Sequence, residues 1–173
     1  MGCGVWSYSG LPLRLSGTGF GELVVALMVS LLVPSLGYQL QAGNFGYFVV
    51  LATAPLFAIN WMMLVFFEFP DVETDRAVGK RTLLVRLGCR RGQVLVTTIT
   101  LGAFGLIALL SITVLPKPAA LALFAVPIAL ITIVLASQAV EGRKKHYSWL
   151  TFSAVALYAI TALLETVGIF LSV

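Results

Sequence analysis

Charged residues are scarce in this sequence: Asp, Glu, Lys and Arg make up 10% of its 173 residues. Soluble globular domains carry about 25% charged residues, so this chain has too few to coat a water-facing surface of its size. Hydrophobic residues reach 60%, and the mean hydropathy is +1.02. The shortage of charge excludes a soluble domain, and the abundance of apolar residues excludes a disordered chain. Composition therefore predicts a protein of the lipid bilayer.

Cysteine and histidine are also rare. The two cysteines, Cys3 and Cys89, form no CxxC or Cys/His spacing, and His146 is the single histidine. These counts exclude a disulfide scaffold and a metal site built from several histidines. The net charge of +4 could suit nucleic acid, but the basic residues cluster at the ends of apolar stretches, as membrane-topology signals do. We therefore predict no nucleic-acid partner.

Five long apolar stretches run through the chain, and only the last contains a charged residue, Glu165. Each is close to the roughly 20 residues, at about 1.5 Å rise per residue, that cross about 30 Å of hydrocarbon. They predict transmembrane helices at residues 23–40, 45–67, 94–115, 119–140 and 149–172. We expect an all-α integral membrane helical bundle of five transmembrane helices, forming a single membrane domain over residues 1–173.

The basic residues predict how the bundle is oriented. With five spans, Arg14 and the connections at 68–93 and 141–148 fall on one side and hold ten of the eleven Lys and Arg residues, while Lys117 lies opposite. By the positive-inside rule, that side is cytoplasmic. We predict a multi-pass cell-membrane protein whose N-terminus and charged loops are cytoplasmic and whose C-terminus is outside.

The connection at 68–93 has an unusual charge pattern. Residues 68–75 hold four acids and no base, whereas residues 76–91 hold six bases and no acid. Asp71 and Asp75 are spaced i, i+4, so a helical turn would project both carboxylates from one face. One or two carboxylates plus substrate phosphates are a usual way to hold Mg²⁺, and Lys80 and Arg81 would complement an anionic phosphate. The pattern indicates a site for a metal ion and a diphosphate.

The same charges also have a simpler interpretation. The acids suit the first turn of a juxtamembrane helix that begins near Pro70, and the bases would then face lipid phosphates. DxxxD alone is a weak pattern. Spacing by itself does not separate the two interpretations.

Three further polar residues lie in the predicted spans or at their border. Asn60 is costly facing lipid, so it should either line a cavity or make a hydrogen bond between helices. Glu22, at the start of the first span, suits a helix cap or a substrate contact, and we favour the cap. Glu165 is an intramembrane site candidate by default, but we expect it to pair locally or to reach the outer interface.

Residues 69–88, FPDVETDRAVGKRTLLVRLG, resemble the second aspartate-rich motif of the UbiA-type intramembrane prenyltransferases. In this motif DxxxD is followed at the expected distances by Gly, Lys-Arg-Thr-Leu and Leu-Gly. Residues 8–15 and 19–23 look like the family's connection into its fifth helix. The resemblance implies that the chain covers helices five to nine of nine. Within the family, the sequence around Asp71 is most similar to that of the 1,4-dihydroxy-2-naphthoate polyprenyltransferases of menaquinone synthesis.

The resemblance implies an activity and a set of site residues. The activity is Mg²⁺-dependent transfer of a polyprenyl group from a prenyl diphosphate to an aromatic acceptor, within the membrane lipid. The implied site residues are Asp71 and Asp75 for the metal, Lys80, Arg81 and Arg14 for the diphosphate, and Tyr8 and Asn60 as candidates for the cavity wall. Arg14 suits a positive-inside anchor equally well, and Tyr8 suits the membrane interface better.

One part of the family's pattern has no counterpart in this sequence. The first motif, an Asn and two Asp on the second helix of the family, is absent, and only seven residues precede Tyr8. We therefore expect the chain to be incomplete alone: it is a C-terminal fragment or truncated gene product, or it pairs with an N-terminal half on another chain. The alternatives to an enzyme are a non-catalytic membrane subunit, a transporter half or an inactive remnant.

Overall fold

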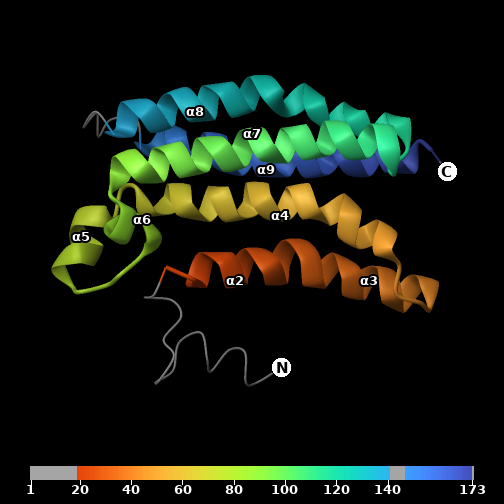
Figure 1. The fold of residues 1–173 in the computed structure, drawn as a ribbon, viewed down its shortest axis with the longest axis horizontal. Helices are drawn as coiled ribbons and strands as arrows, with labels where there is room; N and C mark the ends of the chain where they lie inside the picture. The colour runs from red at the N-terminus through yellow and green to blue at the C-terminus, as the bar shows by residue number, and fades with distance from the viewer. Residues whose placement is uncertain (1–18, 141–146, 173) are drawn as a thin grey trace.

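The structure is a computed structural model and describes residues 19–140 and 147–172. In these residues every regular element is a helix, and Figure 1 shows the long helices running side by side. The long elements are α2 (Gly21–Leu27), η2 (Met28–Leu32) and α3 (Val33–Ala42) in one continuous helix, then α4 (Tyr47–Glu68), α7 (Cys89–Thr113), η3 (Lys117–Ala125) running into α8 (Val126–Val140), and α9 (Tyr147–Phe170). Two short helices, α5 (Val72–Ala77) and α6 (Leu83–Leu87), lie between α4 and α7.

The predicted five-span bundle is confirmed. Five helices of 22 to 25 residues in the described part of the chain are long and apolar enough to cross a membrane. The third begins at Cys89, five residues before the predicted start at 94, because Arg90 and Arg91 continue the helix beyond its apolar stretch. Hydropathy locates the segment that lies in hydrocarbon and does not mark where the helical hydrogen bonds begin. The protein is an integral, multi-pass membrane helical bundle.

The first long helix changes its winding halfway along. Met28–Leu32 forms a π-helical turn, and Pro34 follows at the start of α3. Proline has no backbone N–H, so the carbonyl four residues earlier, that of Ser30, loses its α-helical donor. The Ser30 hydroxyl is buried, accepts a hydrogen bond from Asn60 Nδ2 at 2.7 Å, and lies 3.0 Å from the Tyr158 hydroxyl. These bonds connect the π-helical turn to α4 and α9.

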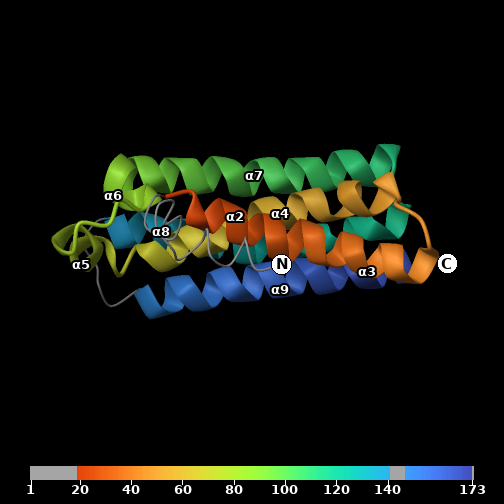
Figure 2. The same cartoon turned by 90° about the horizontal axis from the view of Figure 1, so that it is seen from below.

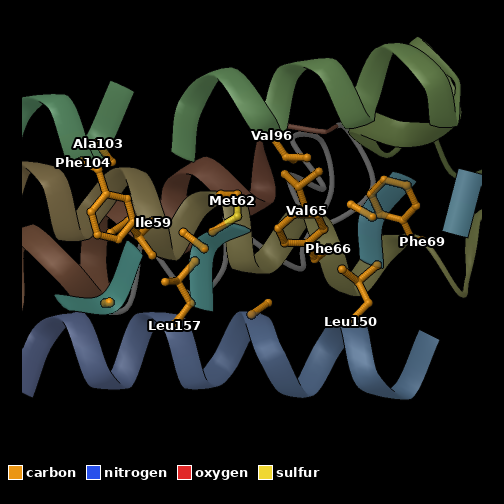
Figure 3. Close-up of a cluster of buried hydrophobic side chains, with 14 of the residues drawn as sticks. Ile59, Met62, Val65, Phe66, Phe69, Val96, Ala103, Phe104, Leu150 and Leu157 are labelled. Carbon is orange, nitrogen blue, oxygen red and sulfur yellow. The ribbon is translucent and has the colours of Figure 1, made fainter. Parts of the chain in front are cut away.

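The hydrophobic core lies around α4, which packs against α2, α7 and α9. Figure 3 shows Ile59, Met62 and Phe66 of α4 between Phe104 of α7 and Leu157 of α9. The helix η3–α8 contributes mainly small residues to this core, namely Ala122, Ala125, Ala129, Ala136 and Ala139. Small side chains let membrane helices approach closely, where van der Waals packing drives their association.

One such close approach is between α9 and the start of η3. A Cβ atom added at Gly168 would collide with the carbonyl group of Pro118. A glycine is therefore required at this crossing, because any larger residue would force the two helices apart.

The charged connection between α4 and α7 stands at one end of the bundle. In both views, α5 projects beyond the long helices at the left-hand end of Figures 1 and 2, and α6 lies beside the start of α7. Gly79 and Gly88 have φ angles of 75° and 78°, a backbone region that glycine adopts without steric cost. These two positions let the connection double back, so that residues 68–82 return to the start of α2.

Candidate functional site

A cavity of about 260 Å³ opens at this end of the bundle, where the end of α4 and the following connection meet the start of α2. Four of its lining residues are acids, and one is a lysine. The complete lining consists of Glu22, Val25, Leu64, Phe67, Glu68, Asp71, Asp75, Lys80 and Thr82. The cavity therefore has an apolar wall on the bundle side and a charged wall on the side of the connection.

Asp71 and Asp75 reach this cavity from a single helical turn. The helix α4 ends at Glu68, since Pro70 offers no N–H to continue it. Asp71 is the N-cap of α5, and the Asp75 backbone N–H donates to the Asp71 carbonyl at 2.7 Å. This is the i, i+4 arrangement expected from the sequence. The helix α5 begins two residues after Pro70, so the proline precedes the helix and its cap.

Lys80 pairs with the second of these aspartates. Its Nζ donates to Asp75 Oδ1 at 2.7 Å, and its backbone N–H donates to the Asp75 carbonyl at 2.9 Å. The positive φ of Gly79 makes this tight turn accessible. The hydrogen bond to Asp75, together with the charge of that carboxylate, raises the pKa of Lys80 above its usual value. Lys80 is therefore a cation at neutral pH.

Arg81, the second base predicted to contact phosphate, has a different position. It is exposed and does not line the cavity, and its carbonyl accepts a hydrogen bond from Arg86 Nε at 2.9 Å. Of the two neighbouring bases, the fold brings Lys80 to the acidic wall and leaves Arg81 outside it.

Glu68 and Glu22 also line the cavity, and neither is among the site residues that the sequence motif implied. Glu68 is 7% exposed, its Oε2 accepts a hydrogen bond from the Leu84 N–H at 2.8 Å, and its Oε1 is buried. The Oε2 atom of Glu22 and the hydroxyl of Thr82 are buried as well. Glu68 is in side-chain hydrogen-bond contact with both Glu22 and Thr82, so these three groups face one another at the cavity.

Glu22 lies in the first turn of α2, the position that suits a carboxylate at a helix start. The N-cap residue is Phe20, and this helix has no side-chain capping hydrogen bond. The Glu22 carboxylate also lines the cavity beside Glu68. One feature of the sequence could have identified both glutamates as site residues: each lies at the border of an apolar stretch, where an unpaired charge is costly.

The remaining predicted residues lie elsewhere. Asn60 makes the hydrogen bond between helices that the sequence left open as an alternative, and it does not line the acidic cavity. Tyr8 and Arg14 lie outside the described residues. Glu165 is 2% exposed, and neither of its carboxylate oxygens has a hydrogen-bond partner among the described residues. The expectation that it pairs locally or reaches the interface was wrong, because the packing of α9 turns it inward.

The donor set at the cavity suits a hard cation that is only partly held by protein. No group of three or more His, Cys, Asp or Glu in the described ranges is arranged to hold a metal ion by itself. Asp71 and Asp75 supply two carboxylates on one helical face. Mg²⁺ is typically bound through one or two carboxylates, with water and substrate phosphates as its other ligands. The residues present fit such a shared site and do not fit a closed metal cage.

Comparison with known proteins provides an independent line of evidence. The model of the UbiA prenyltransferase family matches residues 1–160. A similar protein, the 2-carboxy-1,4-naphthoquinone phytyltransferase of a Synechocystis species, is 29% identical over 92 residues, which are 53% of this chain and 30% of that protein. The matched part thus spans less than a third of that relative's length. No solved structure matches the chain.

Proposed function

Because the chain belongs to the UbiA prenyltransferase family, we propose that it provides the diphosphate-binding part of a site that transfers a polyprenyl group to an aromatic acceptor in the membrane. The observation that carries the proposal is the meeting of Asp71, Asp75 and Lys80 at one cavity. We propose a naphthalene-type quinone precursor of a menaquinone-type pathway as the acceptor. The similarity to a naphthoquinone phytyltransferase supports this choice.

The chain's own residues would bind and orient the prenyl diphosphate. Asp71 and Asp75 would hold Mg²⁺, which supplies charge neutralisation to the diphosphate leaving group when it is bound. Lys80, a cation already at the cavity, would turn from Asp75 to a diphosphate oxygen and stabilise the charge that develops there. Arg14 stays a candidate contact for the diphosphate, whereas Arg81 is exposed outside the cavity and would reach the diphosphate only if its side chain turned inward.

The apolar wall of the cavity has a separate role in this proposal. Val25, Leu64 and Phe67 would surround the allylic carbon. Breaking its carbon–oxygen bond leaves a cation that water would quench, so a wall that excludes water favours capture by the electron-rich ring. The polyprenyl tail would lie among the helices or in lipid.

We further propose that the chain corresponds to helices five to nine of the family's nine and that its site is completed by an N-terminal half. The first aspartate-rich motif of the family has no counterpart in this sequence. An N-terminal half would supply it. The acidic cavity would then lie on the cytoplasmic side, because the basic residues 76–91 stand at the same end of the bundle.

Reconstitution tests the proposed function directly. The chain is co-expressed with the N-terminal half of a family member, and transfer of a radiolabelled prenyl group to a dihydroxynaphthoate is measured with and without Mg²⁺. We expect product only with both halves and with Mg²⁺. Absence of both prenyl diphosphate binding and transfer in this complex would contradict the proposal and favour a non-catalytic membrane subunit.

A further inference from the structure

One buried acid of the chain lies in a cavity of its own, far from the acidic cavity. Glu165 is in α9, five residues before the helix ends at Phe170, so at about 1.5 Å rise per residue it lies about 8 Å from that end. This is the end of the bundle opposite α5 (Figure 2). Glu165 lines a cavity of about 280 Å³ between α3, α4 and α9, together with Tyr38, Phe48, Val49, Ala52, Thr53, Leu56, Thr166 and Ile169.

The carboxyl group of Glu165 has no hydrogen-bond partner in the described part of the chain. The residue is 2% exposed, and neither of its two oxygens is bonded. Thr53 and Thr166 share the cavity but use their hydroxyl hydrogens elsewhere. Thr53 Oγ1 donates to the Val49 carbonyl at 2.8 Å, and Thr166 Oγ1 donates to the Ala162 carbonyl at 2.7 Å. Buried polar atoms in proteins are nearly always hydrogen-bonded, so a ligand in the cavity should complete the bonding of Glu165.

The shape of the cavity limits what can enter it. Tyr38 and Thr166 line it and are exposed, so it opens at the surface of the bundle between α3 and α9. At about 30 Å³ for each water-sized group, a cavity of about 280 Å³ has room for roughly nine such groups. A helix is about 10–12 Å wide with its side chains, which is too wide for this space. The end of one lipid-soluble molecule fits.

The chemistry of the lining specifies the group at that end. A carboxyl group accepts a hydrogen bond in either protonation state, and when protonated it also donates one. A hydroxyl group both donates and accepts, so it matches Glu165 in both states. No basic residue lines this cavity in the described structure, so an anionic group would find no partner. A charged group would also have to enter from the apolar part of the membrane, which is costly.

We propose that Glu165 and the apolar wall around it form a second binding site, for an uncharged, membrane-soluble alcohol. The hydroxyl group of the alcohol would bond to Glu165, and the adjoining hydrocarbon would pack on Phe48, Leu56 and Ile169. The rest of the molecule would leave through the opening between α3 and α9. This site goes beyond the proposed function, because it lies at the opposite end of the bundle and needs neither Mg²⁺ nor a diphosphate.

Photolabelling of the purified full chain in lipid nanodiscs tests the site. The probes are a ten-carbon primary alcohol that carries a diazirine and the methyl ether of the same compound, each at the same mole fraction of the lipid. Labelled peptides are quantified by mass spectrometry. We expect residues 47–57 and 164–170 to be labelled at least about threefold more by the alcohol than by the ether, the usual effect of one hydrogen bond. Unlabelled decan-1-ol should compete.

The chain offers a matched control in the same sample. A cavity of about 290 Å³ lies between α7 and η3 at the same end of the bundle, and no acid lines it in the described structure. Its lining consists of Ala108, Ser111, Ile112, Lys117, Ala120 and Leu123. The two probes should label this cavity equally. A preference for the alcohol at both cavities would reflect only how deep each probe lies in the bilayer, and it would overturn the site.

Two variants separate the hydrogen bond from the shape of the cavity. Glu165→Leu keeps a side chain of similar size without a polar group, so the chain should remain folded and the two probes should label residues 47–57 equally. Glu165→Gln keeps one accepting oxygen and a donating N–H and should retain the preference. Equal labelling of the wild-type chain by the two probes, or a preference that survives Glu165→Leu, would overturn the site.

Three further measurements examine who occupies the cavity. Stronger competition by decan-1-amine than by decan-1-ol would show that the site takes a cation and would overturn the uncharged alcohol. Protection of residues 164–170 on co-expression with an N-terminal half would show that protein covers the cavity and would overturn a lipid ligand. Mg²⁺-dependent binding of a non-hydrolysable prenyl diphosphate analogue should be unchanged in Glu165→Leu. Its loss would place Glu165 in the transfer site, and the second site would then be wrong.

Discussion

Two glutamates buried at opposite ends of the bundle differ in what surrounds them. Glu68 lines the acidic cavity with Asp71, Asp75 and Lys80, and one of its oxygens is bonded to a backbone N–H. Glu165 lines a cavity of about 280 Å³ whose other residues include Phe48, Leu56 and Ile169, and both of its oxygens lack a partner among the described residues. Burial of an acid alone therefore does not identify the site of transfer. The difference is that charged side chains share the cavity with Glu68, whereas the other polar residues that line the cavity of Glu165 in the described structure are the uncharged Tyr38, Thr53 and Thr166.

Removing the proposed metal ligands should have the largest effect and tests whether the cavity of Glu68 is a site of prenyl transfer while that of Glu165 is not. In the reconstituted complex, Asp71→Asn or Asp75→Asn should lower prenyl transfer by about 100-fold or more, the usual cost of losing a group that stabilises charge in the transition state. Glu165→Gln should change the rate by less than about threefold. Initial rates at saturating Mg²⁺ measure both. Full activity in the two Asp variants would remove the metal role assigned to them.

The second prediction concerns stability at the other end of the bundle. Glu165→Leu replaces a buried acid that has no partner in the described structure with an apolar residue, so it should raise the free energy of unfolding by about 1–3 kcal/mol. Unfolding in detergent by a denaturant, followed by circular dichroism, measures the change. A large loss of stability would show that Glu165 makes an interaction essential to the fold, and the contrast with Glu68 would then be wrong.

The third prediction concerns the cation of the acidic cavity. Lys80→Gln should weaken binding of the prenyl diphosphate about tenfold, because a charge-assisted bond is lost. The raised pKa of Lys80 means that the ion pair with Asp75 is present at neutral pH and is lost only as the pH rises through that pKa at alkaline values. Lys117→Gln, at the opposite end, is the matched control and should leave the KM for the diphosphate unchanged.

The smallest expected effect is at the hydrogen bond between α4 and the first long helix. Asn60→Leu removes the bond to Ser30 and should cost about 1 kcal/mol of stability, the usual value for such bonds in membranes. Affinity for the prenyl diphosphate should not change, since Asn60 does not line the acidic cavity. Isothermal calorimetry with the diphosphate analogue checks this. A loss of affinity would show that Asn60 contributes to the binding site after all.

The fold was largely predictable because its signals are local. Apolar stretches of the right length predicted five membrane helices, and all five are present with shifted ends. The i, i+4 spacing of Asp71 and Asp75 would place both carboxylates on one face of a helical turn, and the backbone hydrogen bond between these residues shows that such a turn is present. The π-helical turn at Met28–Leu32 was missed, although Pro34 was a visible signal for a broken hydrogen-bond ladder.

The site was less predictable because two of its nine lining residues, Glu22 and Val25, come from a distant segment. Nothing near Glu22 in the sequence indicates that it faces Glu68, and hydropathy treats both as ends of apolar stretches. For Lys80 and Arg81 the sequence offered two equivalent bases, and the turn at Gly79 brings one to Asp75 while the other stays exposed. Side-chain direction in a turn depends on backbone angles that composition does not encode.

The sequence by itself determined that this is a five-helix membrane protein with an i, i+4 pair of aspartates at one helix end, since hydropathy and helical periodicity act over neighbouring residues. Only the tertiary structure decided that Glu22 joins that pair, that Asn60 bonds to another helix, and that Glu165 is enclosed without a partner in the described bundle. The physical reason is that these outcomes depend on how helices pack against each other, and packing combines residues that lie far apart along the chain.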